Sequence, residues 1–231
     1  MKKINTILAA VSALLMLTVT SANSVEFKAG VSANGMAAYA NVKETLKGDG
    51  TAATGIGGRE TNEEAVLATS FASVFAEISS DEIMGLGFGV SFAPEVADLN
   101  KETRHIANAV QVSGNGNDAD GGVQSVDAKI NDMLSVYLTL PIGDSGAYVK
   151  AGYIQATMVT EESLATGSKY EDIDMEGTTL GGGYEGSLGD MAFWRAEGSY
   201  QMWDDLQANG SEANNSSAGD NSTNKIQAEI G

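Results

Sequence analysis

Apolar and polar side chains alternate with a period of two along most of this chain. This period places successive side chains on opposite faces of an extended backbone and is typical of β-strands. The plainest case is 85–93, where Leu86, Phe88, Val90 and Phe92 alternate with glycine, serine and alanine. The pattern predicts an all-β, antiparallel fold of about eight strands, at 26–39, 66–78, 85–93, 130–140, 147–159, 173–185, 191–203 and 225–230.

The segments between the predicted strands are alternately short and long. Three tight turns are expected at 79–84, 141–146 and 186–190. Four long polar loops are expected at 46–62, 95–124, 161–170 and 204–223. This alternation gives the two ends of a sheet different environments, as in an up-and-down barrel threaded through an outer membrane. Most of the strands also have the roughly ten residues needed to cross a hydrocarbon core, whereas soluble strands usually have about five or six.

The first residues predict export. Lys2 and Lys3 form a positive start, Ile4–Val19 is mostly apolar, and small residues follow as far as Ser24. This order is typical of a secretory signal peptide, and the apolar stretch is short for a membrane anchor. We therefore expect a signal-peptide helix over 1–24 and one barrel domain over 25–231.

The bulk composition excludes several classes of function. The chain has 13 basic and 31 acidic residues, and removal of Lys2 and Lys3 leaves 11 against 31, a net charge of −20. Nucleic acid is therefore not an expected partner, because there is no basic surface to displace counterions. Cysteine is absent, which excludes disulfides and thiolate metal sites. The acidic loops permit weak binding of divalent cations without indicating a site.

The two faces of the predicted strands differ in composition, and the difference favours lipid on the outside. One face is apolar, whereas the other is rich in glycine, serine, threonine and charges of both signs. Eight strands enclose just enough space for side chains, so these charges are expected to pair as a plug. The predicted interior charge network comprises Glu26, Lys28, Glu77, Lys150, Arg195, Glu197, Lys225 and Glu229.

Aromatic residues fall near both ends of the predicted strands. Bands of aromatic side chains at two levels are typical of the two interfaces of a membrane barrel. Ordinary core aromatics are the alternative interpretation. The predicted girdle comprises Phe27, Tyr39, Tyr184, Trp194, Tyr200 and Trp203.

Candidate chemistry is sparse. His105, the single histidine, has no serine or cysteine motif near it, so no catalytic site and no enzyme activity are predicted. Residues 115–122 have the composition of a calcium loop without the spaced bidentate glutamate, and we interpret them as a solvated loop. No cofactor is predicted, and metal binding stays an open question.

Asp172, Asp174 and Glu176 follow one another at a period of two, which would place three carboxylates on one face of an extended backbone. They could bind a cation, or they could pair with Lys150 and Arg195 on neighbouring strands. We expect the pairing, because opposite charges on adjacent strands stabilise each other.

With a signal at Met1–Ser24 followed by this meander, the chain resembles the small eight-stranded outer-membrane barrels of Gram-negative bacteria, the OmpA, OmpX and opacity-protein group. The resemblance implies insertion into outer-membrane lipid by the barrel assembly machinery, with turns in the periplasm and loops outside. It also implies no enzyme activity. Barrels of this group usually end in a terminal aromatic, whereas this chain ends at Ile230–Gly231, so the last strand is expected to be truncated.

The leading hypothesis is a structural or surface-interaction protein of the cell outer membrane, with a plugged interior and long acidic extracellular loops. The alternative is a narrow diffusion channel or a piece of a larger porin. A third class is a soluble acidic β-sandwich that binds divalent cations.

Overall fold

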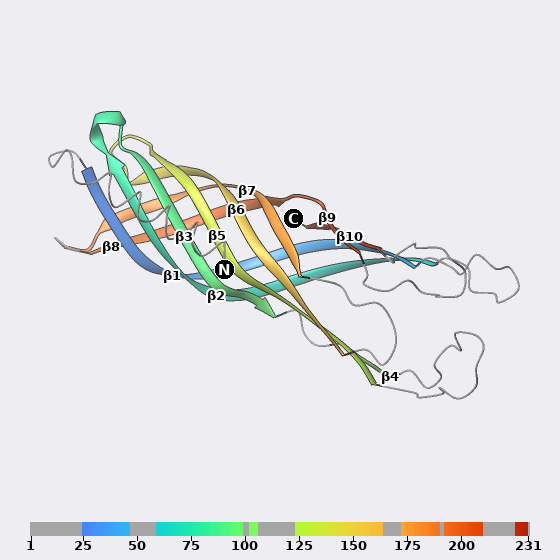
Figure 1. The fold of residues 1–231 in the computed structure, drawn as a ribbon. Helices are drawn as coiled ribbons and strands as arrows, with labels where there is room; N and C mark the ends of the chain where they lie inside the picture. Colours follow the sequence, from blue (N-terminus) through green and yellow to red (C-terminus); the bar gives the residue numbers. More distant parts are fainter. Residues whose placement is uncertain are drawn as a thin grey trace, which may run out of the picture.

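The computed structural model describes residues 25–46, 59–98, 102–105, 123–163, 172–189, 192–209 and 225–230. These residues form one antiparallel sheet of ten strands and one short 3₁₀-helix (Figure 1). The elements are β1 (Val25–Leu46), β2 (Arg59–Ser80), η1 (Asp81–Ile83), β3 (Leu86–Asp98), β4 (Glu102–His105), β5 (Val123–Pro141), β6 (Ala147–Ser163), β7 (Ile173–Ser187), β8 (Phe193–Trp203), β9 (Leu206–Asn209) and β10 (Lys225–Ile230). Among the described residues, no helix is long and apolar enough to cross a membrane.

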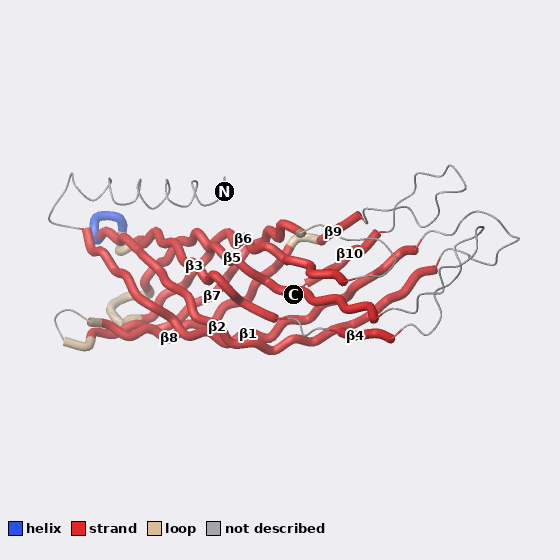
Figure 2. Tube along the Cα trace, turned by 60° about the horizontal axis from the view of Figure 1, so that its bottom comes forward, coloured by secondary structure: helices blue, strands red, loops and turns tan. Residues whose placement is uncertain are grey.

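The sheet curls round on itself. Its strand order is β8-β7-β6-β5-β3-β2-β1-β10-β9. The short strand β4 pairs with the first residues of β5. The two ends of this order are consecutive in the chain, because only Asp204 and Asp205 separate β8 from β9. The sheet therefore has a hollow, curled shape, and its long strands run along the length of the molecule (Figure 2).

The alternation of the sequence predicts the strands well and their ends less well. Every predicted strand corresponds to an observed one, and η1 and the turns at 142–146 and 188–189 lie where tight turns were expected. The expected loops were too long at their edges. β1 runs on to Leu46, β2 starts at Arg59 and β6 runs to Ser163, because paired backbones continue a ladder beyond the last clearly alternating residue. β4 and β9, both inside expected loops, were not predicted.

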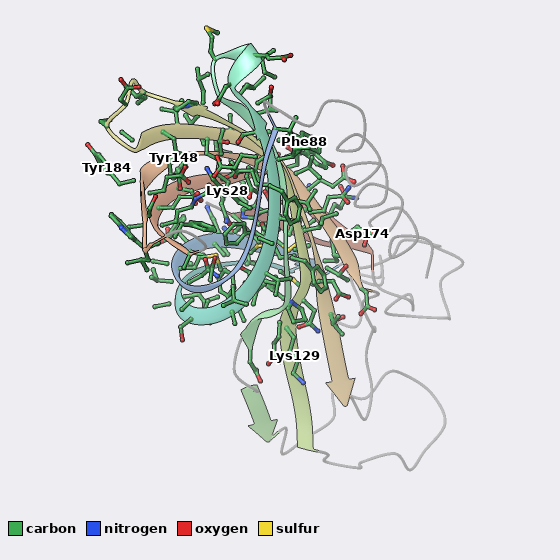
Figure 3. All side chains as sticks on the ribbon, turned by 90° about the vertical axis from the view of Figure 1, so that its left-hand side faces the viewer. Lys28, Phe88, Lys129, Tyr148, Asp174 and Tyr184 are labelled. Atoms are coloured by element: carbon green, nitrogen blue, oxygen red, sulfur yellow. The ribbon has the colours of Figure 1, made fainter. Side chains whose placement is uncertain are left out.

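The outer face of the curled sheet is apolar. Large exposed side chains project from it on seven strands, and Val31 and Val66 are 83% and 81% exposed. Viewed along the sheet, Phe88 and Tyr184 point away from the ring, whereas Lys28 and Tyr148 point into it (Figure 3). The outer set includes Phe27, Val31, Tyr39, Val66, Val74, Phe88, Leu138, Leu140, Val149, Tyr153, Leu180, Tyr184, Trp194, Tyr200 and Met202.

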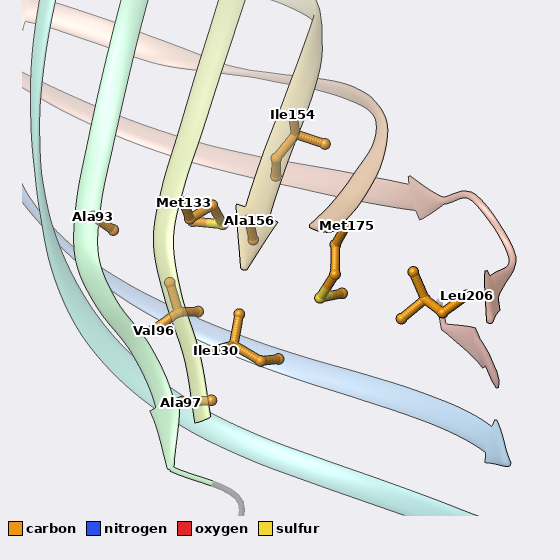
Figure 4. Packing of buried hydrophobic residues seen from close by; sticks show 9 residues of the cluster. All are labelled: Ala93, Val96, Ala97, Ile130, Met133, Ile154, Ala156, Met175 and Leu206. Atoms are coloured by element: carbon orange, nitrogen blue, oxygen red, sulfur yellow. The ribbon is translucent and has the colours of Figure 1, made fainter. Parts of the chain in front are cut away.

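An apolar cluster fills the interior toward the end opposite the three tight turns. Side chains from β3, β5, β6, β7 and β9 meet there (Figure 4). Its members are Ala93, Val96, Ala97, Ile130, Met133, Ile154, Ala156, Met175 and Leu206.

A β-bulge in β5 supplies two members of this cluster. The register of β5 against β6 shifts between Asn131 and Leu134, and Asp132 has a positive φ of 55°. An extra residue reverses the in-and-out alternation beyond it. Ile130 and Met133 therefore both point inward, although they are three positions apart.

Candidate functional site

The interior near the three tight turns, called here the turn end, holds a network of charged side chains. Arg195 on β8 reaches Glu77 on β2, with its Nη1 2.9 Å from one carboxylate oxygen and its Nη2 3.1 Å from the other. The side chain of Glu77 is buried, with 3% of its surface exposed, and that of Arg195 is largely buried, with 11% exposed. Thr139 on β5 donates a further hydrogen bond of 3.3 Å to Glu77. Glu77 therefore has the bidentate partner that a buried carboxylate requires.

The same arginine joins this pair to β7 and β1. Arg195 Nη2 lies 2.7 Å from Glu185 Oε2, and the Nζ of Lys28 lies 2.7 Å from Glu185 Oε1. Lys28 also lies 3.3 Å from Glu26, whose side chain is 65% exposed at the mouth of the interior. These five residues, the turn-end network, link four strands across the interior and alternate in sign, so no charge in the network lacks a counter-charge.

Aromatic rings surround the guanidinium of Arg195. Its Cζ lies 4.9 Å from the ring centre of Tyr148, 5.3 Å from that of Phe75 and 5.9 Å from that of Phe193. Phe75 and Phe193 themselves meet edge to face, with their centroids 6.0 Å apart. Stacking of this kind stabilises a desolvated cation and fixes the planar fork in one orientation.

A second ion pair lies next to the turn-end network. Lys150 on β6 lies 2.7 Å from Glu197 on β8, and the hydroxyl of Tyr148 donates a 2.8 Å hydrogen bond to the other oxygen of Glu197. The Nζ of Lys150 also lies 4.1 Å from the ring centre of Tyr137. Tyr148 contacts both Arg195 and Glu197, so it connects the two groups of charges.

Glycines make room for these inward aromatic rings. A Cβ on Gly89 would clash with the ring of Tyr137, and a Cβ on Gly30 would lie 2.8 Å from the ring of Phe75. A side chain at either position would displace a ring that packs near Lys150 or Arg195. These glycines on the inner face of the sheet therefore leave the room that the large inward side chains occupy.

The structure brings most of the predicted interior residues together, but not all of them. Lys28, Glu77 and Arg195 share one network with Glu26 at its edge, and Lys150 pairs with Glu197. Glu185 and Tyr148 were not predicted. The alternation of β7 could have located Glu185, because it falls on the same face as the inward Met175 and Thr179.

Two predicted members of the network lie elsewhere. Glu229 is exposed on the outer face, because Ala228 and Ile230 are the residues of β10 that pack against the apolar cluster. Directly opposite residues of an antiparallel pair point to the same side, and Glu229 is opposite the exposed Asn41. The prediction for Glu229 was therefore wrong. The side chain of Lys225 lies outside the described residues.

The predicted aromatic girdle residues lie on the outer face of the sheet, except for Trp203. Five of its members are exposed on the outer face: Phe27, Tyr39, Tyr184, Trp194 and Tyr200. Trp203 instead lies on the inner face, where it is partly buried against the apolar cluster. The alternation of β8 explains this difference, because Trp203 shares its face with Arg195 and Glu197.

The expected pairing of three carboxylates with Lys150 and Arg195 was also wrong. Asp172, Asp174 and Glu176 are exposed on the outside of the sheet, whereas both cations point into its interior. Glu176 accepts a hydrogen bond of 3.3 Å from Gln155, its directly opposite neighbour on β6.

The two candidates in the second expected loop, 95–124, lie wholly or in part outside the described residues. His105 ends the short strand β4 opposite Val123, and its side chain lies outside the described residues. The stretch 115–122 lies outside them altogether.

A cavity of about 740 Å³ separates the charged and apolar parts of the interior. Polar side chains from six strands line it, and so do Lys150 and Glu197. The buried hydroxyl of Ser135 is among them and has no hydrogen-bond partner. The polar wall comprises Asn34, Ser73, Ser91, Ser135, Thr179, Ser199 and Gln201.

Toward the turn end, this interior presents fixed and paired charges. Within the described ranges, no group of three or more histidine, cysteine, aspartate or glutamate side chains is placed to hold a metal ion. No protein-family model, no curated protein and no solved structure matches this chain.

Proposed function

We propose that this chain is an outer-membrane β-barrel protein with a structural or surface-interaction role and an interior plugged by charge pairs. The observation that carries the proposal is the inverted polarity of the sheet. Its outer face exposes large apolar side chains on seven strands, and its interior holds Arg195, Glu77 and Lys28. An exposed apolar surface of this extent marks contact with another apolar phase, and lipid is the phase that surrounds a barrel on all sides.

The distribution of polar residues along the strands supports the same proposal. The turns are short, whereas β1 and β2 extend past Tyr39 and Val66 into residues such as Asn41 and Glu64, which are exposed and polar. A strand that leaves the hydrocarbon region needs polar outer residues from that level onward. We infer that the acidic loops between the long strands lie outside the cell and make its surface contacts, and that the turns are periplasmic.

The plugged interior is tested by single-channel recording in planar bilayers. Purified protein is expected to give no stable ohmic conductance, because the turn-end network and the Lys150–Glu197 pair close one end of the interior. Large, stable pores from the unmodified protein would contradict the plug. The membrane location is tested separately by cell fractionation, with recovery in the outer-membrane fraction and heat-modifiable gel migration as the expected results.

A narrow diffusion channel is the second candidate, and the cavity beside Lys150 favours it. This cavity of about 740 Å³ has a polar wall, which a channel would require. The two proposals differ in one recording: a channel conducts before any substitution, whereas a plugged barrel conducts only after the charge pairs are removed. A soluble cation-binding sandwich has less support, because its apolar faces would pack against each other. Release into the periplasmic fraction would favour it.

A further inference from the structure

The cavity between the charged and apolar parts of the interior has no role in the plugged barrel proposed above. Its volume of about 740 Å³ lies within the range of about 300–1,000 Å³ that small-molecule sites occupy. The hydroxyl of Ser135 lies in its wall, is buried and, within the described ranges, has no hydrogen-bond partner. Burial of a hydroxyl without a partner is unfavourable, so this group indicates that a polar molecule occupies the cavity.

Uncharged hydrogen-bonding side chains from several strands surround this hydroxyl. Ser135 on β5 lies directly opposite Ser91 on β3. Thr179 on β7 lies directly opposite Gln201 on β8, and Asn34 adds an amide from β1. Directly opposite residues of an antiparallel pair point to the same side, and hydroxyls and amides both donate and accept hydrogen bonds. The wall is therefore complementary to a ligand that has several hydroxyl groups.

The charges in the cavity wall are already paired. Among the described residues that line the cavity, Lys150 and Glu197 are the charged ones, and the two side chains approach to 2.7 Å. A charged ligand would lose its hydration without gaining a counter-charge, because each of these groups is already neutralised by the other. The wall therefore favours a neutral ligand over an anion or a cation.

The side of the cavity nearest the apolar cluster presents aromatic rings. Trp203 on β8 and Phe71 on β2 line the cavity and are partly buried against that cluster. A ring of this kind provides a flat apolar surface, and the indole N–H of tryptophan can also donate a hydrogen bond. A sugar presents C–H groups on its faces and hydroxyls around its edge. Hydroxyl and amide groups on one side of the cavity and rings on the other are complementary to this shape.

We propose that the cavity binds a neutral sugar or another uncharged polyol, of monosaccharide to disaccharide size. Ser135 and Thr179 bond to ligand hydroxyls from two parts of the wall, and Trp203 packs against a C–H face. The bound sugar provides the partner that the Ser135 hydroxyl lacks. This inference goes beyond the proposed function, because it concerns what the interior holds. It does not depend on whether the sheet lies in a membrane or whether the interior conducts.

The test is a titration of the full chain that is followed by the fluorescence of Trp203. The chain has two tryptophans, and the other, Trp194, is 46% exposed on the outer face. Trp194→Phe therefore leaves one reporter, in the cavity wall. Glucose and maltose are the neutral ligands, and glucosamine and glucuronate are the charged comparisons. The protein is kept in a zwitterionic detergent, because a detergent with a sugar headgroup would compete for the site.

Glucose or maltose is expected to give a saturable change in the fluorescence of Trp203, with a Kd of millimolar order. Glucosamine and glucuronate are expected to give none. The converse variant, Trp203→Phe, keeps only the outer tryptophan and should show no saturable change with any of the four compounds. The absence of saturation with both neutral sugars would overturn the proposal. Equal or tighter binding of either charged compound would also overturn it.

Two substitutions in the Trp194→Phe background locate the site. Ser135→Ala and Thr179→Val are each expected to weaken binding of the neutral sugar roughly tenfold, because each removes a hydrogen bond to the ligand. Ser70→Ala, on the exposed outer face of β2, is the matched control and should leave the Kd unchanged. Unchanged affinity in both cavity variants would overturn the assignment.

Urea unfolding without sugar separates a binding role of Ser135 from a structural one. Ser135→Ala should unfold at the same urea concentration as its parent or at a higher one, because the hydroxyl that it loses has no partner among the described residues. A clearly lower midpoint would assign this hydroxyl to the stability of the fold and would overturn its role as a ligand contact.

Discussion

Arg195 and Glu77 form a bidentate ion pair across the interior of the sheet, although 118 positions of sequence separate them. The pair joins β8 to β2, which are not neighbours in the sheet. It therefore fixes the curvature of the sheet directly, whereas backbone ladders fix only adjacent strands. A buried pair of this kind is strongly destabilising when one partner alone is removed.

We predict that Glu77→Gln and Arg195→Gln each lower the free energy of unfolding by about 3 kcal/mol, because each leaves a buried charge short of a partner. The double variant is expected to lose less than the sum of the two. Urea unfolding followed by tryptophan fluorescence measures all three. Asp144→Asn, in an exposed turn, is the control and should change the free energy by less than about 0.5 kcal/mol. Strict additivity would show that the two side chains do not act as a pair.

Truncation of the apolar cluster should also be destabilising. Ile154 is 1% exposed and lies in this cluster, so Ile154→Ala is expected to lower the free energy of unfolding by about 2–5 kcal/mol. Val31→Ala removes methyl groups from the exposed outer face and should change it by about 0.5 kcal/mol. The same urea titration measures both variants. Similar losses from the two would contradict the assignment of inner and outer faces.

The ring of Tyr137 leaves no room for a side chain at Gly89. Gly89→Ala would place a methyl group against the ring of Tyr137, and overpacking of this kind usually destabilises by about 1–3 kcal/mol. Gly35→Ala is the matched control on β1, because no atom lies within 4 Å of the added carbon. Thermal unfolding should separate the two variants. A Gly89→Ala protein as stable as Gly35→Ala would show that the Tyr137 ring can move without loss.

If the outer face contacts lipid, the cost of an outward-facing arginine should depend on its position along the strand. Leu180 is 58% exposed on the outer face of β7, and Glu176 shares that face four residues nearer the long-loop end. Leu180→Arg should lower folding stability in lipid vesicles by about 2–4 kcal/mol, because the charge would enter the hydrocarbon region. Glu176→Arg should have a much smaller effect.

Urea-induced unfolding in vesicles measures both arginine variants, and the same titration in detergent-free buffer is a further comparison. Equal tolerance of both substitutions in vesicles would count against a membrane-facing surface at Leu180. It would leave the interior network unaffected.

The period of two in the sequence determined the strands and most of their faces. This succeeded because alternation is a local property: the backbone of a strand directs neighbouring side chains to opposite sides whatever the rest of the chain does. Leu138 and Tyr137 could therefore be assigned outward and inward from sequence, as the structure has them. The candidate charges Lys28, Glu77 and Arg195 followed from the same pattern, since they occupy the face opposite the apolar one.

Only the tertiary structure decided which of these charges meet, because pairing across the interior depends on curvature and register. Lys28 bonds to Glu185, and no local pattern relates β1 to β7. The bulge at Asn131–Leu134 reversed the alternation and brought both Ile130 and Met133 into the apolar cluster. β10 turned Glu229 outward because β1, its neighbour, directs Ala40 and Val42 inward. A strand's own sequence gives two faces, and its neighbours decide which face is inside.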